Sequence, residues 1–117
     1  MISVVMPTLN AEDHLARTLS ALVPGVVAGL IKEVVIVDGG SDDATLEIAE
    51  STGCQIIKAD HERGLQLWQG CRAARCDWLL ILHPNSQLGD GWMDQVQTHM
   101  KNFPLRAIFP KDSPSIA

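Results

Sequence analysis

The sequence is poor in cysteine and has no concentration of basic residues, and each shortage argues against a class of protein. It contains three cysteines, no two of which form a CxxC pair, so neither a zinc site nor a redox motif is indicated. We interpret Cys54, Cys71 and Cys76 as reduced thiols packed in or beside apolar elements. The formal net charge of -5 argues against binding to nucleic acid, because a phosphate backbone is held by clustered lysine and arginine.

Long apolar runs and a secretion signal are also missing. The longest apolar run, Ala21–Ile31, is interrupted by Pro24, Gly25 and Gly29, so it is too short and too broken to cross a bilayer. The first residues, Met1–Pro7, lack the basic start and the small-residue cleavage site of a signal peptide. We therefore expect no transmembrane segment and a cytoplasmic location.

What the sequence does have is the composition of one globular unit. It is 117 residues long, with 46% hydrophobic and 20% charged residues, and it shows no repeat, linker or low-complexity segment. This length is enough for one hydrophobic core and too short for two. We expect residues 1–117 to form a single domain.

Short apolar runs alternate with helical patterns along the chain. Four of these runs predict buried strands: Ile2–Met6, Val34–Val37, Gln55–Ala59 and Trp78–Leu82. A proline ends the first run, and an Asp-Gly-Gly turn ends the second.

The first two predicted helices lie between these strands. Asn10 is the predicted N-cap of the first helix, which we expect to end at Pro24 and Gly25. Ser41 is the predicted N-cap of the second, and Gly53 stands where that helix would close.

The second half of the chain continues the alternation. Gly64–Ala74 has apolar residues at helical spacing, and Asp90 is the predicted N-cap of a last helix that ends at Pro104. Ala107–Phe109 is expected to be an edge strand, and the tail Lys111–Ala117 to be frayed.

This alternation predicts an α/β fold, with a doubly wound, mostly parallel sheet, right-handed crossovers and three layers, α/β/α. Polar residues follow each strand, in the loops at residues 7–10, 38–42, 60–64 and 83–86. Ligands bind to such sheets at the carboxyl ends of the strands, where the strand order reverses. We therefore expect the first and fourth strands to be neighbours, with their loops flanking one crevice.

Each polar residue also has a simpler structural interpretation. Thr8, Asn10, Ser41 and Asp42 are residue types that cap helices, and Gly39-Gly40 is a common turn. Taken singly, each is better explained by structure than by function, so only their combination carries an argument.

That combination resembles the opening of family-2 glycosyltransferases of the GT-A fold, whose nucleotide-binding half is Rossmann-like. The resemblance lies in four segments: Val4–Asn10 (VVMPTLN), Glu33–Thr45 (EVVIVDGGSDDAT), Arg63–Gly70 (RGLQLWQG) and Leu82–Ser86 (LHPNS). It extends to about Trp92, and the VDGGSDDAT segment is its most specific part. It covers the first half or so of a typical family domain.

The resemblance implies binding of a nucleoside diphosphate sugar. It places Thr8 and Asn10 in the nucleoside cleft, and Asp38, which opens the turn at Gly39, on the base or ribose. We expect Asp38 to face solvent or ligand and to matter more for binding than for folding. Arg63 is placed near the base or diphosphate, with an ordinary surface charge as an equal alternative.

The chain departs from the family pattern after its fourth strand. Family members carry an Asp-x-Asp element there that holds a divalent metal, whereas this chain has His83-Pro84-Asn85. Manganese could use His83 and Asn85, but magnesium prefers carboxylate and water oxygens. His83 is equally well explained as a polar residue that ends a buried strand.

Three functions follow from this pattern. The first is an inverting glycosyltransferase that moves a sugar to an acceptor hydroxyl, here with a degenerate metal motif. The second is a non-catalytic nucleotide-sugar-binding module that has lost the metal and acceptor sites. The third is an assembly module completed by a partner chain. A homo-oligomer is expected, because a short chain leaves an apolar face that a second copy would cover.

Overall fold

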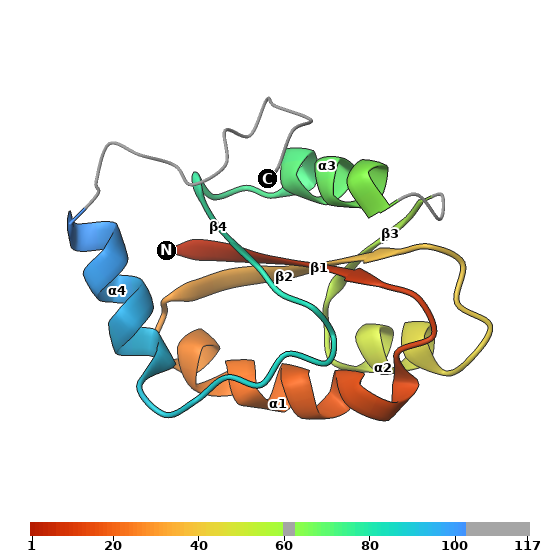
Figure 1. Ribbon diagram of the computed structural model, residues 1–117, viewed down its shortest axis with the longest axis horizontal. Coiled ribbons are helices and arrows are strands. Elements are labelled where there is room, and N and C mark those ends of the chain that lie inside the picture. Colours follow the sequence, from red (N-terminus) through yellow and green to blue (C-terminus); the bar gives the residue numbers. More distant parts are fainter. Residues whose placement is uncertain (60–62, 103–117) are drawn as a thin grey trace.

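The computed structural model describes residues 1–59 and 63–102, which form alternating strands and helices (Figure 1). In chain order they are β1 (Ile2–Thr8), α1 (Glu12–Val27), β2 (Ile31–Asp38), α2 (Thr45–Ser51), β3 (Gln55–Lys58), α3 (Arg63–Ala73), β4 (Trp78–Ile81) and α4 (Trp92–Asn102). The expected helix end at Pro104, the edge strand at 107–109 and the tail at 111–117 lie outside the described residues.

The described strands form one parallel sheet in the order β3-β2-β1-β4. This order confirms that the first and fourth strands are neighbours. From β1 to β3 the chain moves outward in one direction, and it then returns past β1 to place β4 on the other side. The switch point therefore lies between β1 and β4.

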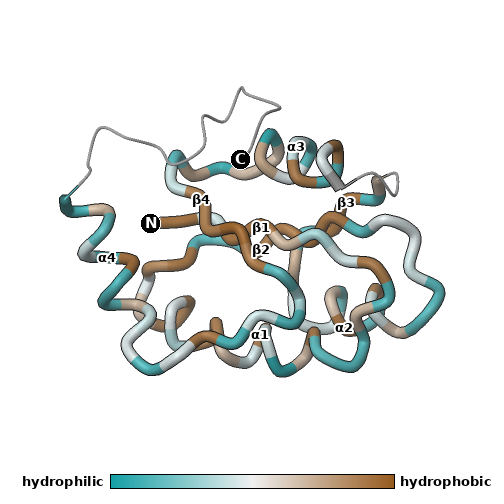
Figure 2. The backbone as a smooth tube through the Cα atoms, viewed as in Figure 1, coloured by the Kyte–Doolittle hydropathy of each residue, from teal (hydrophilic) through white to brown (hydrophobic). Residues whose placement is uncertain are grey.

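The helices divide between the two faces of the sheet. Figure 1 shows α1 and α2 on one face and α3 on the other. Alternate residues of β1 supply both cores: Val4 and Met6 pack with Leu15 of α1, while Val5 packs with Cys71 of α3. In Figure 2 the strands form an apolar centre between the two helical layers. The expected three-layer α/β/α architecture is confirmed.

Helix α1 continues through Pro24, so the predicted end at Pro24 and Gly25 is wrong. The helix instead closes at Gly29, which has φ 78°. The Leu30 N–H donates to the Gly25 carbonyl at 3.0 Å and the Gly29 N–H to the Val26 carbonyl at 3.1 Å, which is a Schellman motif. These two bonds follow the proline and satisfy the carbonyls of Gly25 and Val26 at the helix end. The closing role predicted for Gly53 is confirmed, because Gly53 has φ 80° and ends α2 with the same pattern.

Helix α4 begins later than expected. Gly91, with φ 81°, directly precedes Trp92, and its carbonyl accepts the N–H of Gln95 at 3.1 Å. Gly91 therefore has the position of the N-cap, and the assignment of Asp90 as the cap is wrong. No helix among the described residues has the length and apolar character needed to cross a membrane.

Strand β1 runs through Pro7 to Thr8, two residues beyond the predicted end. The Leu82 N–H donates to the Val5 carbonyl at 3.0 Å, so Val5 and, two residues on, Pro7 turn their backbone groups toward β4. Strand β4 pairs with β1 only as far as Val5. Pro7 therefore lacks its N–H where no ladder partner is present, and the sheet opens beside it.

Candidate nucleotide cleft

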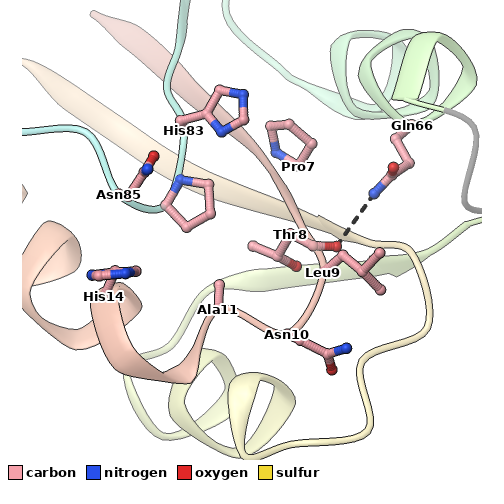
Figure 3. Close-up of a pocket in the computed structure, with 10 residues that line it drawn as sticks. Pro7, Thr8, Leu9, Asn10, Ala11, His14, Gln66, His83 and Asn85 are labelled. Carbon is pink, nitrogen blue, oxygen red and sulfur yellow. Dashed lines mark hydrogen bonds between the residues drawn. The ribbon is translucent and has the colours of Figure 1, made fainter.

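A cleft of 240 Å³ lies at this opening, between the carboxyl ends of β1 and β4 (Figure 3). Its described lining residues come from four parts of the chain: Pro7 and Thr8 at the end of β1 with Leu9, Asn10 and Ala11 after it, His14 on α1, Gln66 on α3, and His83, Pro84 and Asn85 after β4. The structure thus brings together four of the residues expected at the site: Thr8, Asn10, His83 and Asn85. Arg63, the first residue of α3, lies one turn before Gln66.

Asp38 is not among the residues that line the cleft. Its side chain is 1% exposed, and its carboxylate accepts hydrogen bonds from the hydroxyls of Thr8 at 2.7 Å and Ser41 at 2.6 Å. It also accepts from the N–H groups of Gly40 at 3.0 Å and Ser41 at 2.8 Å. The expectation that Asp38 faces solvent or ligand is therefore wrong. The carboxylate turns into its own loop, because the loop supplies the donors that its charge requires.

These hydrogen bonds also fix the charge state of Asp38. Burial by itself would raise the pKa of its carboxyl group, but the hydrogen bonds from Ser41, Thr8 and Gly40 outweigh burial and lower that pKa below its usual value. Asp38 therefore remains ionised at neutral pH, as an anion at the junction of the β1 and β2 loops.

Asn10 and Ser41 join the two loops instead of capping their own helices. Asn10 has φ 50°, a left-handed conformation that asparagine tolerates. Its backbone N–H donates to the Ser41 hydroxyl at 2.8 Å, and its side-chain carbonyl accepts from the Asp42 N–H at 2.8 Å. The N-caps are Ala11 for α1 and Ala44 for α2, so the predicted caps are wrong.

At the N-termini of α1 and α2, backbone N–H groups of each helix donate hydrogen bonds to side chains at the start of the other. The Ala11 N–H donates to the Thr45 hydroxyl at 2.8 Å, and the Glu12 N–H to the Asp43 carboxylate at 3.2 Å. In return, the Ala44 N–H donates to the Glu12 carboxylate at 3.1 Å. The hydrogen bond from the Thr45 hydroxyl lowers the pKa of Asp43. Reciprocal capping of this kind locks the β1 and β2 loops together and gives that side of the cleft a fixed shape.

Two polar cleft residues were missed by the sequence analysis. His14 lies in the first turns of α1, and Gln66 is a buried amide on α3. In the sequence, Gln66 precedes the small residues Gly70 and Ala74 at a spacing of four, and the structure shows all three to be buried. That period marks the face of α3 that meets the sheet. No comparable pattern identifies His14.

The loop after β4 forms a tight turn held to α1. The His83 N–H donates to the Ser86 hydroxyl at 3.0 Å, and the Ser86 N–H returns a bond to the His83 carbonyl at 3.0 Å. The hydroxyl of Thr18, a buried residue of α1, donates to the Pro84 carbonyl. The positions of His83 and Asn85 are thus set from both ends of their turn.

The donor set in the cleft does not fit a site for a hard divalent cation. None of the described residues that line the cleft is aspartate or glutamate. Within residues 1–59 and 63–102, no three histidine, cysteine, aspartate or glutamate side chains are grouped to hold a metal ion. His83 and Asn85 offer an imidazole and a neutral amide, whereas magnesium requires carboxylate oxygens and water.

Comparison with known proteins shows where this chain belongs. The sequence profile described as glycosyl transferase family 2 matches residues 3–111. A glucosyl-3-phosphoglycerate synthase from Mycolicibacterium paratuberculosis is 31% identical over 90 residues, which are 69% of this chain and 27% of that protein. A PGL/p-HBAD biosynthesis glycosyltransferase from Mycobacterium bovis is 33% identical over 95 residues, 75% of this chain and 36% of that protein.

Solved structures give the same result. The glucosyl-3-phosphoglycerate synthase of Mycobacterium tuberculosis, in complex with Mn²⁺, uridine diphosphate and glucosyl-3-phosphoglycerate, matches with a TM-score of 0.65 at 27% identity, over 72% of this chain and 33% of that one. The mannosyl-3-phosphoglycerate synthase of Rubrobacter xylanophilus matches in fold, with a TM-score of 0.69 at 22% identity, over 78% of this chain and 33% of that one. The chain thus spans 27% to 36% of the length of the curated relatives above.

Proposed function

Because this chain belongs to glycosyl transferase family 2, we propose that its cleft binds a nucleoside diphosphate sugar for transfer to an acceptor hydroxyl. One observation carries the proposal. The β1 loop with Thr8 and Asn10 and the β4 loop with His83 and Asn85 face each other across one cleft at the switch point of the sheet. The uridine diphosphate complexes of the mycobacterial synthase support a uridine nucleotide as the first ligand to test.

In the proposal, the nucleoside lies on the side of the cleft formed by the β1 and β2 loops, which we call the nucleoside side. Hydrogen bonds between the two loops give this side a fixed shape. In the proposal, the segment Thr8–Asn10 lies against the nucleoside, and the turn at Gly39 lets the β2 loop approach it. Direct contact between Asp38 and the base or ribose requires Asp38 to exchange one of its present partners, and the Ser41 hydroxyl is the one that can rotate away. Arg63, at the start of α3, is proposed to approach the base or diphosphate.

The transfer itself is proposed to be a direct displacement with inversion. The acceptor oxygen forms a bond to the anomeric carbon of the sugar while the bond from that carbon to the diphosphate oxygen breaks. The nucleoside diphosphate leaves, and the acceptor proton passes to a base. This chain contributes by holding the donor in line for attack, and the base is proposed to come from outside the described cleft residues, none of which is an acid.

A second function is favoured by the loop after β4. Since His83 and Asn85 do not fit a magnesium site, this chain could bind the nucleotide sugar without transferring it. A metal beside the diphosphate supplies several kcal/mol of charge stabilisation, and each ~1.4 kcal/mol changes the rate tenfold. We propose that Mn²⁺ binds weakly at His83 and Asn85 and that transfer by this chain alone is slow or absent. Assembly as a homo-oligomer, with the exposed Val23, Val26 and Val27 of α1 covered, and a cytoplasmic location stay predictions.

Calorimetric titration of the chain with uridine diphosphate or guanosine diphosphate, each with and without MnCl₂, tests these proposals. Saturable binding that changes little with manganese is the expected result. In the double variant His83→Asp, Asn85→Asp, manganese should strengthen nucleotide binding by about tenfold or more, since two carboxylates complete a hard-cation site. No binding of uridine or guanosine diphosphate under either condition would refute the nucleotide cleft. Strong manganese-dependent sugar transfer by the native chain would refute the degenerate metal site.

A further inference from the structure

The side chain of Gln66 joins the ends of the two central strands. It is 4% exposed, and its amide nitrogen lies 3.0 Å from the Val37 carbonyl and 3.3 Å from the Thr8 carbonyl, to which it donates. Thr8 is the last residue of β1, and Val37 is the residue before the last of β2, so both carbonyls lie where the two loops begin. Figure 3 shows Gln66 reaching from α3 toward the Thr8 carbonyl at the wall of the cleft.

Gly39 leaves the space that this amide occupies. A Cβ atom at Gly39 would lie 3.0 Å from Gln66 Nε2 and 3.3 Å from Gln66 Cδ, closer than ordinary van der Waals contact. The Gly39 N–H donates to the Thr8 carbonyl at 2.9 Å. The Thr8 carbonyl oxygen therefore accepts hydrogen bonds from both the Gly39 N–H and the Gln66 amide. The amide of Gln66 thus packs against the turn that follows Asp38.

The helix that carries Gln66 is itself held close to the sheet. One turn further along α3, a Cβ atom at Gly70 would lie 2.5 Å from Val37 Cγ2 and 2.6 Å from Val5 Cγ1. The bare backbone of α3 therefore contacts the same two strands that Gln66 joins. This close approach leaves a long side chain little freedom to adopt other rotamers, so the amide is preorganised.

We infer that Gln66 is a positioning residue of the nucleotide cleft. Its amide holds the loop of Thr8–Asn10 and the loop of Asp38–Ser41 at a fixed separation, and so it sets the width of the nucleoside side before a ligand arrives. The inference rests on the proposed function, because it assigns to Gln66 the affinity of that same cleft for a nucleoside diphosphate. Gln66 acts through the two loops and needs no contact with the ligand.

The test compares Gln66→Met, which keeps the length but removes the donor, with the matched control Ser3→Ala. Ser3 is a buried residue at the opposite end of β1 that donates to Glu33 at 2.6 Å, so both substitutions remove a hydrogen-bond donor from a buried side chain. Uridine diphosphate affinity is expected to fall about tenfold in Gln66→Met and less than about twofold in Ser3→Ala. Gln66→Asn, which keeps the amide on a shorter side chain, is expected to lose an intermediate amount and serves if the methionine variant does not fold.

A second measurement separates this inference from the proposed function. Hydrogen exchange of the Gly39 amide in the unliganded protein is expected to become at least about tenfold faster in Gln66→Met and to stay unchanged in Ser3→Ala. Native affinity for uridine diphosphate in both Gln66 variants overturns the positioning role. If the native chain binds no nucleotide, the proposed function fails separately, and native exchange of Gly39 in the Gln66 variants would then overturn the positioning role as well.

Discussion

Replacing Asp38 by alanine should destabilise the folded protein. The sequence had instead predicted that Asp38 matters more for binding than for folding. The substitution removes an ionised carboxylate that accepts from the hydroxyls of Thr8 and Ser41 and from the N–H groups of Gly40 and Ser41. Asp38 is 1% exposed and Thr8 is 2% exposed, so water reaches neither side chain readily. The Thr8 hydroxyl would be left buried without its acceptor.

The cost can be estimated from these partners. A hydrogen bond to a charged group contributes about 1.5–3 kcal/mol, and an unpaired buried hydroxyl costs about 1–3 kcal/mol. The four bonds do not add, because Gly40 is exposed and Ser41 half-buried, so both can reach water after the change. We expect the free energy of unfolding to fall by about 3 kcal/mol, a large share of the roughly 5–15 kcal/mol typical of a domain.

Urea unfolding and thermal melting measure this loss directly. A decrease of about 3 kcal/mol corresponds to a Tm lower by about 12 °C in a domain of this size. Asp42→Ala is the matched control: Asp42 is an exposed acid in the same loop, and the free energy of unfolding should change by less than about 0.5 kcal/mol. A Tm for Asp38→Ala within about 2 °C of the native value would refute the reasoning, since it would mean that the hydrogen-bonded turn contributes nothing net.

Two further predictions concern packing and acid. Gly70→Ala should lower the free energy of unfolding by about 2 kcal/mol in urea titrations, because the new methyl group would lie 2.5 Å from Val37 Cγ2. In the control Gly64→Ala, on the same helix, the new methyl group would have no heavy atom within 4 Å, so the free energy of unfolding should hardly change. Equal effects of the two substitutions would contradict the packing argument. The hydrogen bonds that lower the pKa of Asp38 outweigh its burial, so the stability they provide is fully present above the unfolded-state pKa of about 3.9 and is lost as the pH falls through the lower folded-state value. The free energy of unfolding measured for the native chain should therefore approach that of Asp38→Asn as the pH is lowered from about 6 to about 3, whereas a constant difference would exclude Asp38 as the titrating group.

The fold was predictable because its signals are local. Each strand is a short apolar run, and Gly53 ends a helix through its own backbone freedom, so these features can be recognised from neighbouring residues. The order of β1 and β4 was also predictable, because the polar loops of a doubly wound sheet must meet at its switch point. The expected positions of Thr8 and His83 on one cleft followed from that rule.

Some errors occurred where a side chain has a partner far away in the sequence, and others where a nearby partner or a later stop signal decided the outcome. Asparagine is a common N-cap residue, but the partners of Asn10 are Ser41 and Asp42, more than 30 positions away. The Asp38 carboxylate accepts from Gly40 and Ser41 in its own loop as well as from the Thr8 hydroxyl on the neighbouring strand β1. Pro24 failed as a stop signal because the closing motif at Gly29 comes after it. The propensity of a residue type does not show which partner its side chain will take. Asn10 was therefore assigned to a helix cap and Asp38 to a ligand contact.

The two sides of the cleft differ in a way that bears on catalysis. On the proposed nucleoside side, hydrogen bonds of the ionised Asp38, of the Asn10–Ser41 pair and of the Gln66 amide fix the β1 and β2 loops. On the side of the β4 loop, His83 and Asn85 are held in position by Ser86 and Thr18, but none of the described lining residues there is an acid that could hold a cation. The hydrogen bonds that fix the β1 and β2 loops therefore do not involve the β4 loop, whereas stabilising the charge that develops on a leaving diphosphate is the task of groups on the β4 side. A chain built in this way is expected to retain nucleotide affinity while transferring sugar slowly, unless a partner or another part of a longer protein supplies the missing carboxylates.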